Sequence, residues 1–471
     1  MIKVILFLSV LFVLTICQDD HVYPLLGSNM VLQRNSNKTK LWGSTSSSIV
    51  NIQLRKSEVV IDNYEAKSVS GKWEVTLKSY PAGGPYQILV KTASVVVYQN
   101  VMFGDVYLCS GQSNMEFTIN RGLNASSEVK DSVNYPNIHF FKVAHNDSPK
   151  PVDNVRGQWR VPDPSIGEFS AACYFFARNI YKALNGEVPI GLIESTWGGT
   201  PIQVWSSPDA IKQCNQTNGP SQPNHLWNGQ IVPLLKYNVK AALWYQGENN
   251  AGRGHDLKVC KLYSCQLQAM IRDWRAKWNV GDFPFYFVLL AGFRPGNNWA
   301  EFRLAQLEAL HQPHTYFATA MDIGDREDIH PKDKQEVGRR LSLIALNQIY
   351  GKSVAYKGPT LKSVKSQTSS KSATITVDFD HVVGAIVTKN TPKCKAPCCS
   401  PGNLFRITTS TRKDVVPNNV QIKANIITLT FDKNETEQFK ELNYAMFPFP
   451  ECVYIDNNTL LPVNAFRYIN K

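Results

Sequence analysis

Ser113 lies in a segment whose residue types suit nucleophilic catalysis. Residues 110–116 read SGQSNME and directly follow a short apolar run at residues 106–109. A serine in a glycine-containing turn between a strand and a helix exposes its hydroxyl, and backbone N–H groups at the start of the helix can stabilise an oxyanion. By itself the segment also fits a serine that caps a helix. A nucleophilic role for Ser113 therefore depends on the other loops.

A histidine surrounded by carboxylates occurs much later in the chain. Residues 322–331 read DIGDREDIHP, so Asp325, Glu327 and Asp328 all lie shortly before His330. Histidine is the usual general base near neutral pH, and a carboxylate can orient its ring. The pattern favours His330 as a base, although a solvated acidic loop is the commoner structure.

Two further loops carry groups that suit an oxyanion. Residues 194–201 read ESTWGGTP, and adjacent glycines let the backbone approach a ligand closely. Residues 244–250 read WYQGENN, and their amide NH₂ groups are neutral donors that can stabilise developing negative charge. Each loop also fits an ordinary turn, but all four follow apolar runs, so a purely structural explanation requires four coincidences.

These loops follow short apolar runs that are typical of strands buried on both faces. The runs lie at residues 106–109, 189–193, 239–244, 284–290 and 316–321. Apolar residues at helical spacing lie between them, at residues 172–184, 265–278, 303–311 and 335–350. The alternation predicts a parallel sheet with helices on both sides. Ligands of such sheets bind at the carboxyl ends of the strands, where the four loops lie.

Alternating patterns predict β-rich regions on both sides of this core. Residues 49–54 and 73–77 alternate with period two, and residues 373–377 and 426–431 do the same near the C-terminus. We therefore expect an N-terminal β-domain at 18–100, an α/β core at 101–350 and a C-terminal β-rich domain at 351–471.

The N-terminus predicts a secretory signal peptide at residues 1–17. Lys3 precedes thirteen uncharged, mostly apolar residues, which is too short for a membrane span of about 20 residues. No other stretch is long and apolar enough to span a membrane. The expected location is the secretory pathway, with a secreted or lysosomal product. Six glycosylation sequons fit that location, at Asn37, Asn124, Asn146, Asn215, Asn434 and Asn457.

The mature chain keeps nine of the ten cysteines, so at least one thiol is expected to stay unpaired. Cys109 is our candidate for that thiol, because its strand-like segment faces the core. Cys260 and Cys265 are close enough in sequence to close a short loop. The remaining C-terminal cluster suggests further disulfides rather than zinc, because no histidine lies nearby; it comprises Cys394, Cys398, Cys399 and Cys452.

Composition excludes several classes of protein. The chain of 471 residues is 43% hydrophobic and 19% charged, as is usual for globular proteins and not for disordered or fibrous ones. Its net charge of +12 is spread along the chain, without the concentrated basic face that nucleic-acid binding requires. The complete phosphate-binding motif Gly-x-x-x-x-Gly-Lys-Ser/Thr is also missing.

Taken together, the four loops resemble the SGNH hydrolases and, within them, the sialate O-acetylesterases. The segments that carry the resemblance are Gly111-Gln112-Ser113-Asn114, Gly198-Gly199, Gln246-Gly247-Glu248 and Asp328-Ile329-His330-Pro331. Shorter similarities extend along the mature chain, at residues 29–34, 82–86, 273–275, 284–288, 443–445 and 461–463. The resemblance implies an SGNH-type three-layer α/β/α core at 101–350.

The resemblance also implies an esterase that removes O-acetyl groups from sialic acids, with the 9-O position preferred. The implied partner is an O-acetylated sialic acid or sialoglycan, and no metal or organic cofactor is expected. Ser113 would attack the acetyl carbonyl and His330 would transfer the protons. Asp328 is the preferred orienting acid, because Asp-Ile-His-Pro resembles this subfamily; Glu327, at the general SGNH position, and Asp325 are the alternatives.

The implied oxyanion site combines backbone N–H groups of Ser113 and Gly199 with one side-chain amide. The candidates for that amide are Gln246 first, Asn250 second and Asn249 third, because related esterases place it differently.

Two other functions fit the same sequence. An acetyl esterase acting on xylan or pectin would share the four loops, whereas a sialate site should add an arginine or lysine for the substrate carboxylate. A glycan-binding protein with an inactive esterase site is the other alternative. The presence of Ser113, Gly199 and His330 argues against it.

Overall fold

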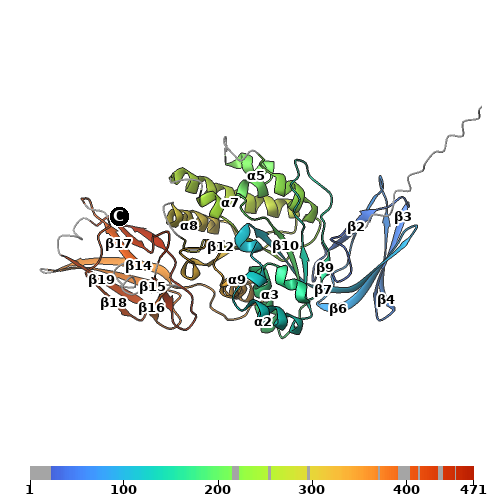
Figure 1. The fold of residues 1–471 in the computed structure, drawn as a ribbon. Coiled ribbons are helices and arrows are strands. Elements are labelled where there is room, and N and C mark those ends of the chain that lie inside the picture. The colour runs from blue at the N-terminus through green and yellow to red at the C-terminus, as the bar shows by residue number, and fades with distance from the viewer. Residues whose placement is uncertain are drawn as a thin grey trace, which may run out of the picture.

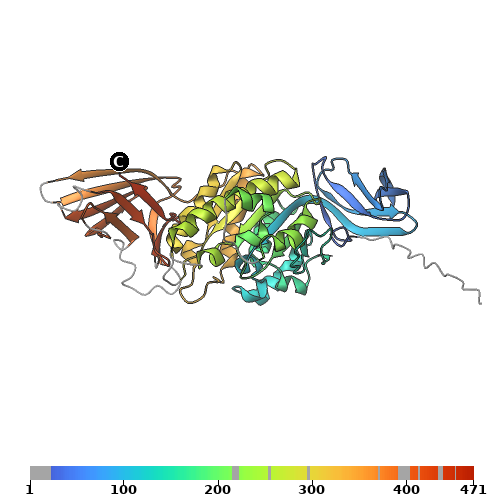
Figure 2. The same ribbon diagram turned by 90° about the horizontal axis from the view of Figure 1, so that it is seen from above.

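Three parts of the molecule lie in a row, with the α/β core between two β-rich parts (Figure 1), and a perpendicular view gives the same arrangement (Figure 2). The computed structural model describes residues 23–214, 222–252, 256–293, 298–369, 372–390, 404–411, 414–432, 439–450 and 452–470. The predicted signal peptide and three cysteines of the C-terminal cluster (Cys394, Cys398 and Cys399) lie outside these ranges.

The central sheet confirms the predicted α/β core. Its strands follow the order β13–β12–β11–β7–β10–β8–β9, and all neighbours in this row are parallel except β8 and β9. The bounds are β7 (Val95–Gly111), β8 (Ile138–Lys142), β9 (Trp159–Arg160), β10 (Ile190–Thr196), β11 (Ala241–Tyr245), β12 (Phe285–Leu289) and β13 (Thr315–Thr319). The sequence does not predict β8, because His139 and Lys142 interrupt its apolar run.

Helices cover both faces of this sheet, as expected for three layers. Successive side chains of β7 point to opposite faces of the sheet. Tyr107 packs in one hydrophobic core with α3 and α9, and Leu108 packs in the other with α7 and α8. These helices are α3 (Ala171–Ala183), α9 (Lys334–Gln348), α7 (Leu257–Trp278) and α8 (Trp299–Leu307). The shorter helices are α1 (Ser113–Glu116), α2 (Ala125–Asp131), α4 (Ile202–Trp205), α5 (Pro208–Gln213) and α6 (Glu248–Ala251).

Three of the long helices, α3, α7 and α9, begin at a capping residue. Ser170, Asp256 and Asp333 each accept a hydrogen bond from a backbone N–H in the first turn of α3, α7 and α9. Helix α7 therefore begins well before the predicted residue 265.

Strand β7 joins the N-terminal β-rich part to the core. Its first half pairs antiparallel with β6, and its second half pairs with β10 and β11. The expected domain boundary near residue 100 thus lies inside one continuous strand. The other strands here are β1 (Val31–Gln33), β2 (Lys40–Ser44), β3 (Ile49–Lys56), β4 (Val59–Lys67), β5 (Lys72–Thr76) and β6 (Gly83–Lys91).

The C-terminal part is β-rich, as the alternating patterns predict. One antiparallel sheet has the order β14–β15–β19–β18. Strands β16 and β21 form a two-stranded sheet, and β17, β20 and β22 form a three-stranded one. Ile375 and Val377 of β15 are buried with Ile427 and Leu429 of β19. The bounds are β14 (Thr360–Thr368), β15 (Ser372–Asp380), β16 (Ile386–Asn390), β17 (Phe405–Thr408), β18 (Asn419–Lys423), β19 (Ile426–Asp432), β20 (Glu441–Tyr444), β21 (Cys452–Asp456) and β22 (Phe466–Ile469).

Two disulfides correct the cysteine predictions. Cys109 is not a free thiol: it faces α3 from β7 and is bonded to Cys173. Cys265 is bonded to Cys214 rather than to Cys260, since Cys260 and Cys265 lie in the continuous helix α7 instead of a loop. Cys260 is a buried free thiol. Within the described ranges, every helix is too short or too polar to cross a membrane.

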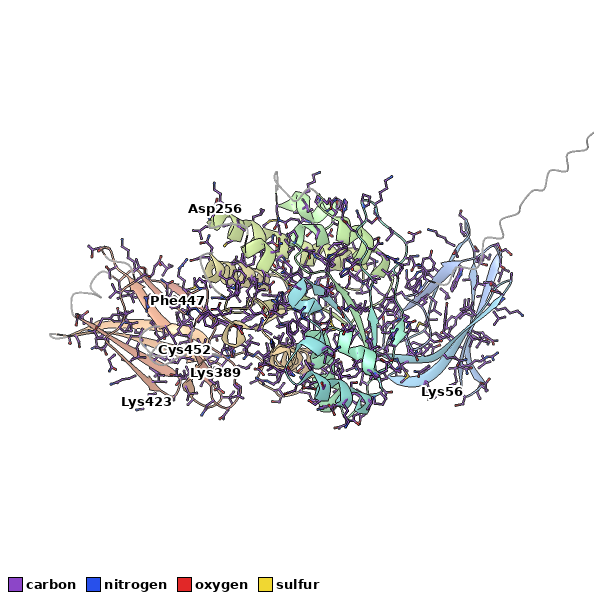
Figure 3. The ribbon with its side chains drawn as sticks, viewed as in Figure 1. Lys56, Asp256, Lys389, Lys423, Phe447 and Cys452 are labelled. Atoms are coloured by element: carbon purple, nitrogen blue, oxygen red, sulfur yellow. A yellow bond between two sulfur atoms is a disulfide. The ribbon has the colours of Figure 1, made fainter. Side chains whose placement is uncertain are left out.

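A buried carboxylate joins the core to the C-terminal part. Asp322, just after β13, is fully buried and receives two hydrogen bonds from the Arg340 guanidinium, at 2.6 and 2.8 Å. Lys389 of β16, labelled in Figure 3, donates to Asp322 Oδ2 at 2.9 Å. Burial opposes the charge, but Arg340 and Lys389 outweigh it and lower the pKa of Asp322 to about 2.

Asp322→Asn should destabilise the fold by about 3 kcal/mol near pH 7, because it leaves Arg340 and Lys389 without their shared buried charge. The folded-state pKa is below the unfolded value of about 4, so this stabilisation is present above pH 4 and is lost as the pH falls toward 2. Thermal unfolding across this range should show the two proteins converging at acid pH. Asp380→Asn, at a half-exposed side chain of β15, is the control. A difference that stays constant with pH would contradict the assignment.

Candidate active site

The loops after β7, β10 and β11 meet at the carboxyl edge of the central sheet. The N–H of Gln112 donates to the Tyr245 carbonyl at 3.0 Å, and the N–H of Trp197 donates to the Gly111 carbonyl at 3.1 Å. A Cβ atom at Gly111 would lie only 2.2 Å from the Tyr245 oxygen, so only glycine allows the β7 loop to pass β11 this closely. Ser113 follows at the start of α1.

Ser113, His330 and Asp328 form a hydrogen-bonded row. His330 Nε2 lies 2.9 Å from Ser113 Oγ, and His330 Nδ1 lies 3.2 Å from Asp328 Oδ1. The same Asp328 oxygen accepts the backbone N–H of His330 at 2.9 Å. Because Nδ1 faces a carboxylate, it carries the proton, and Nε2 accepts the hydrogen bond from the Ser113 hydroxyl. This is the arrangement of a nucleophile, a base and an orienting acid.

Among the three candidate acids, Asp328 is the one whose hydrogen bond to the imidazole is observed. Asp325 accepts the backbone N–H of Glu327 at 2.9 Å, and Glu327 has an exposed side chain. The two-residue spacing lets Asp328 reach both the backbone and the ring of His330.

The environment of His330 favours the neutral imidazole. Burial lowers the pKa of His330, and the positive charges of Lys334 and Arg121 lower it further, whereas Asp328 raises it. The ring also stacks on Phe117, with 6.3 Å between ring centroids. A neutral imidazole is the form that accepts a proton from serine.

The glycine pair lies against the nucleophile loop. The N–H of Gly198 donates to Glu116 Oε2 at 2.7 Å, and a Cβ atom at Gly198 would lie 3.4 Å from Ser113 Cβ. Gly199 has φ +72°, and a Cβ atom there would meet nothing within 4 Å. A Cβ atom at Gly199 would therefore point into open space.

The three candidate amides have different surroundings. Gln246 is fully buried, and its Nε2 donates to the Thr200 carbonyl at 3.1 Å and to Asn250 Oδ1 at 2.7 Å. Asn250 is also buried, and its Nδ2 donates to Gln203 Oε1 at 3.1 Å. The half-buried Asn249 instead donates to the Gly199 carbonyl at 2.7 Å. Gln246 and Asn250 are buried inside the fold, whereas Asn249 is half-buried, and this difference in burial favours Asn249 as the amide that faces a ligand.

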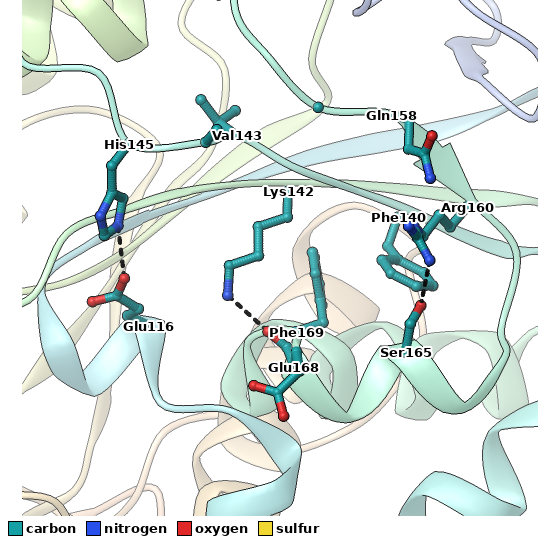
Figure 4. A pocket seen from close by; sticks show the side chains of 12 residues that line it. Glu116, Phe140, Lys142, Val143, His145, Gln158, Arg160, Ser165, Glu168 and Phe169 are labelled. Atoms are coloured by element: carbon teal, nitrogen blue, oxygen red, sulfur yellow. Dashed lines mark hydrogen bonds and ion pairs between the residues drawn. The ribbon is translucent and has the colours of Figure 1, made fainter.

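A pocket that the sequence does not reveal opens beside the nucleophile loop (Figure 4). At one end, His145 Nε2 lies 2.8 Å from Glu116 Oε1, and the His145 ring stacks on Trp197 with 4.1 Å between centroids. The pocket has a volume of about 730 Å³, and Lys142 and Arg160 also line it. Apart from Glu116 in the Ser113 segment, its residues come from β8, β9 and neighbouring loops that match no motif, so no sequence signal marks them.

The fold and the loops at its strand ends define the class of this protein as an SGNH-like carbohydrate esterase. Residues 103–346 match the family described as carbohydrate esterase, sialic acid-specific acetylesterase. A sialate O-acetylesterase of Rattus norvegicus is 31% identical over 447 residues, which cover 79% of this chain and 81% of the relative. The sialate O-acetylesterase of Homo sapiens is 33% identical over 392 residues, which cover 72% of this chain and 73% of the relative.

A solved structure agrees with these sequence relatives. The carbohydrate acetylesterase from Xanthomonas citri has a TM-score of 0.83 and 29% identity, and the match covers 96% of this chain and 100% of that one. The chain belongs to the sialic acid-specific acetylesterase family of carbohydrate esterases, which confirms the resemblance seen in its four loops.

The acid limb of the esterase pH profile should lie below the ordinary histidine pKa of about 6.5. The base must be neutral, so kcat/KM falls as the pH drops through the pKa of His330, which burial lowers. Asp328→Asn should move the limb to still lower pH and reduce kcat, because Asp328 raises that pKa and orients the ring. Profiles of p-nitrophenyl acetate hydrolysis test this, with Glu327→Gln as the control. A shift in the Glu327 variant instead would assign the orienting role to Glu327.

Proposed function

We propose that this protein hydrolyses O-acetyl esters of sialic acids, with the 9-O-acetyl group preferred, through an acetyl-enzyme intermediate. The observation that carries the proposal is the 2.9 Å contact between Ser113 Oγ and His330 Nε2, in a chain of this esterase family. Ser113 Oγ attacks the acetyl carbonyl while His330 takes its proton. His330 then protonates the departing sugar hydroxyl, and water activated by His330 releases acetate.

The proposed oxyanion site consists of the backbone N–H groups of Ser113 and Gly199 and the Asn249 amide. The open space at Gly199 and the half-buried position of Asn249, which contacts the Gly199 carbonyl, support this choice over the buried Gln246 and Asn250. Preorganised neutral donors stabilise the tetrahedral intermediate without reorganisation during the reaction.

The pocket beside Glu116 supports a sugar substrate that carries a carboxylate. Lys142 and Arg160 both line it, and a sialic acid carboxylate would form charge-assisted hydrogen bonds with such groups. The curated relatives named sialate O-acetylesterase support the same substrate. The similarity to a carbohydrate acetylesterase over 96% of the chain favours acetylated polysaccharides such as xylan as the second candidate.

We also propose that the protein matures in the secretory pathway. The Cys109–Cys173 and Cys214–Cys265 disulfides support this, since disulfides form and persist in oxidising compartments. The predicted signal peptide would direct it there, to a secreted or lysosomal destination.

Wild-type protein should release acetate from 9-O-acetylated sialic acid, and Ser113→Ala should lose nearly all of this activity. Acetate release by the two proteins, each shown to be folded by thermal unfolding, tests both the reaction and the nucleophile. A higher kcat/KM on acetylated xylan than on the sialic acid would replace the proposed substrate by the second candidate. Equal activity of wild type and Ser113→Ala would contradict the mechanism.

Asn249→Ala should lower kcat about a hundredfold with little change in KM, because one oxyanion donor is worth about 3 kcal/mol in the transition state. Steady-state kinetics on p-nitrophenyl acetate measures this. The thermal unfolding temperature should stay near that of wild type, since Asn249 is only half-buried. Gln246→Ala is the comparison: it should lower the unfolding temperature, because Gln246 links Thr200 and Asn250 inside the fold.

A further inference from the structure

A lysine is completely buried directly behind the candidate active site. Lys334 begins α9, four residues after His330, and its side chain is not exposed to solvent. Its Nζ donates to Asn114 Oδ1 at 2.8 Å and to the Pro331 carbonyl at 2.5 Å. The ammonium also lies 4.5 Å from the centroid of the Phe117 ring. The proposed mechanism assigns no role to this charge.

Asn114 connects the lysine to a buried carboxylate. Its Nδ2 donates to Glu248 Oε1 at 2.6 Å and to the Ile329 carbonyl at 3.0 Å. Asn114 and Glu248 are both nearly inaccessible to solvent, with 1% and 4% of their surface exposed. A single amide therefore bridges a buried cation and a buried anion.

The bonds of this group surround the two catalytic side chains. Ile329 and Pro331 are the neighbours of His330 on either side, and Asn114 and Lys334 each bind one of their carbonyls. Asn114 is itself the residue after Ser113. The distance between the serine and histidine loops is thus set through one amide and one ammonium group.

The arrangement is energetically expensive for a purely structural contact. Burial lowers the pKa of Lys334 to about 7 and raises the pKa of Glu248. Buried charges separated by an amide recover little of their desolvation cost, and apolar residues of similar volume usually fill such space with equal or better stability. Charges kept in such surroundings occur preferentially at functional sites.

We propose that Lys334, Asn114 and Glu248 form a buried positioning unit that holds His330 against Ser113 and places a positive charge beside the imidazole. The inference rests on the proposed function in one respect, since it assigns the residues that position the base of that reaction. Lys334 is a positioning residue rather than a catalytic one, because it acts through Asn114 and the backbone on both sides of His330.

The charges around His330 predict how its titration responds. Asp328 faces the ring from its own loop, Lys334 from α9, and Arg121 from the 3₁₀ turn Ile119–Arg121. Glu248 and Asp333 act on Lys334. Lys334 lowers the pKa of His330, so removing its charge should raise that pKa and move the acid limb of kcat/KM to higher pH.

Three variants of the full-length protein, assayed on p-nitrophenyl acetate, separate charge from hydrogen bonding. Lys334→Met should lower kcat by about a hundredfold with KM little changed, because small misplacements of a catalytic group cost about this much. Its acid limb should move to higher pH. Lys334→Gln keeps an NH₂ donor without the charge, so it should regain part of kcat but keep the shifted limb. Lys332→Met, at an exposed lysine of the same loop, is the matched control and should match wild type.

Several outcomes would overturn the proposal. Folded Lys334→Met with the kcat and acid limb of wild type would remove any role for Lys334. A second outcome is that both Lys334 variants lose kcat in proportion to a lowered unfolding temperature, while the acid limb of kcat/KM does not shift. Lys334 would then have only a structural role. If Lys334→Met does not fold, the test uses only the acid limb of kcat/KM of the near-isosteric Lys334→Gln variant. An acid limb at the same pH as in wild type would reject the proposal.

The assay separates this proposal from the proposed function. p-Nitrophenyl acetate reports on Ser113 and His330 without requiring a sugar. A wild-type protein that cleaves this ester in a Lys334-dependent way but leaves acetylated sialic acid intact would retain the positioning unit and reject the substrate.

Discussion

The hydrogen bond between Ser113 Oγ and His330 Nε2 is the contact on which the site depends, and it joins residues 217 positions apart. Two further strands, β11 and β12, separate β7 from β13 in the sheet. The histidine loop must therefore reach back across the sheet edge to meet the serine. The bonds from Asn114 and Lys334 to the carbonyls that flank His330 hold the loop in that position.

Electrostatics around this contact combine opposing effects. Burial, Lys334 and Arg121 favour neutral His330, while Asp328 favours the protonated ring that the proposed mechanism forms when His330 takes the serine proton. A base of this kind stays neutral to a lower pH than an ordinary histidine and still accepts a proton in the transition state. The same surroundings contain several buried charges, whose desolvation lowers the stability of the fold. In return, these charges position His330 and adjust its pKa.

The β-rich parts at each end are attached to the segments that lead to Ser113 and to His330. Strand β7 pairs with β6 in its first half and ends just before Ser113. Asp322, between β13 and the histidine loop, is ion-paired with Lys389 of the C-terminal part. Each flanking part is thus bonded to a segment that leads to the serine or to the histidine.

The sequence by itself indicated the class of the protein, through the resemblance of its four loops to the SGNH hydrolases. It also predicted the parallel core and marked Ser113, His330 and Gly199 as site candidates from local patterns, since apolar runs specify buried strands and polar loops after them mark the ligand-binding edge. The β-rich flanks were also predictable, because strand alternation is local.

Only the tertiary structure decided which groups meet. The partner of Cys109 depends on how α3 packs on β7, and the sequence favoured an unpaired thiol. The choice among Gln246, Asn249 and Asn250 depends on how deeply each amide is buried, and neighbouring residues on one loop have the same local signature. Lys334 looks like any first-turn lysine in sequence, and its burial arises only when the loops of Asn114 and Glu248 close over it. Contacts between distant segments are set by packing, which no short motif records.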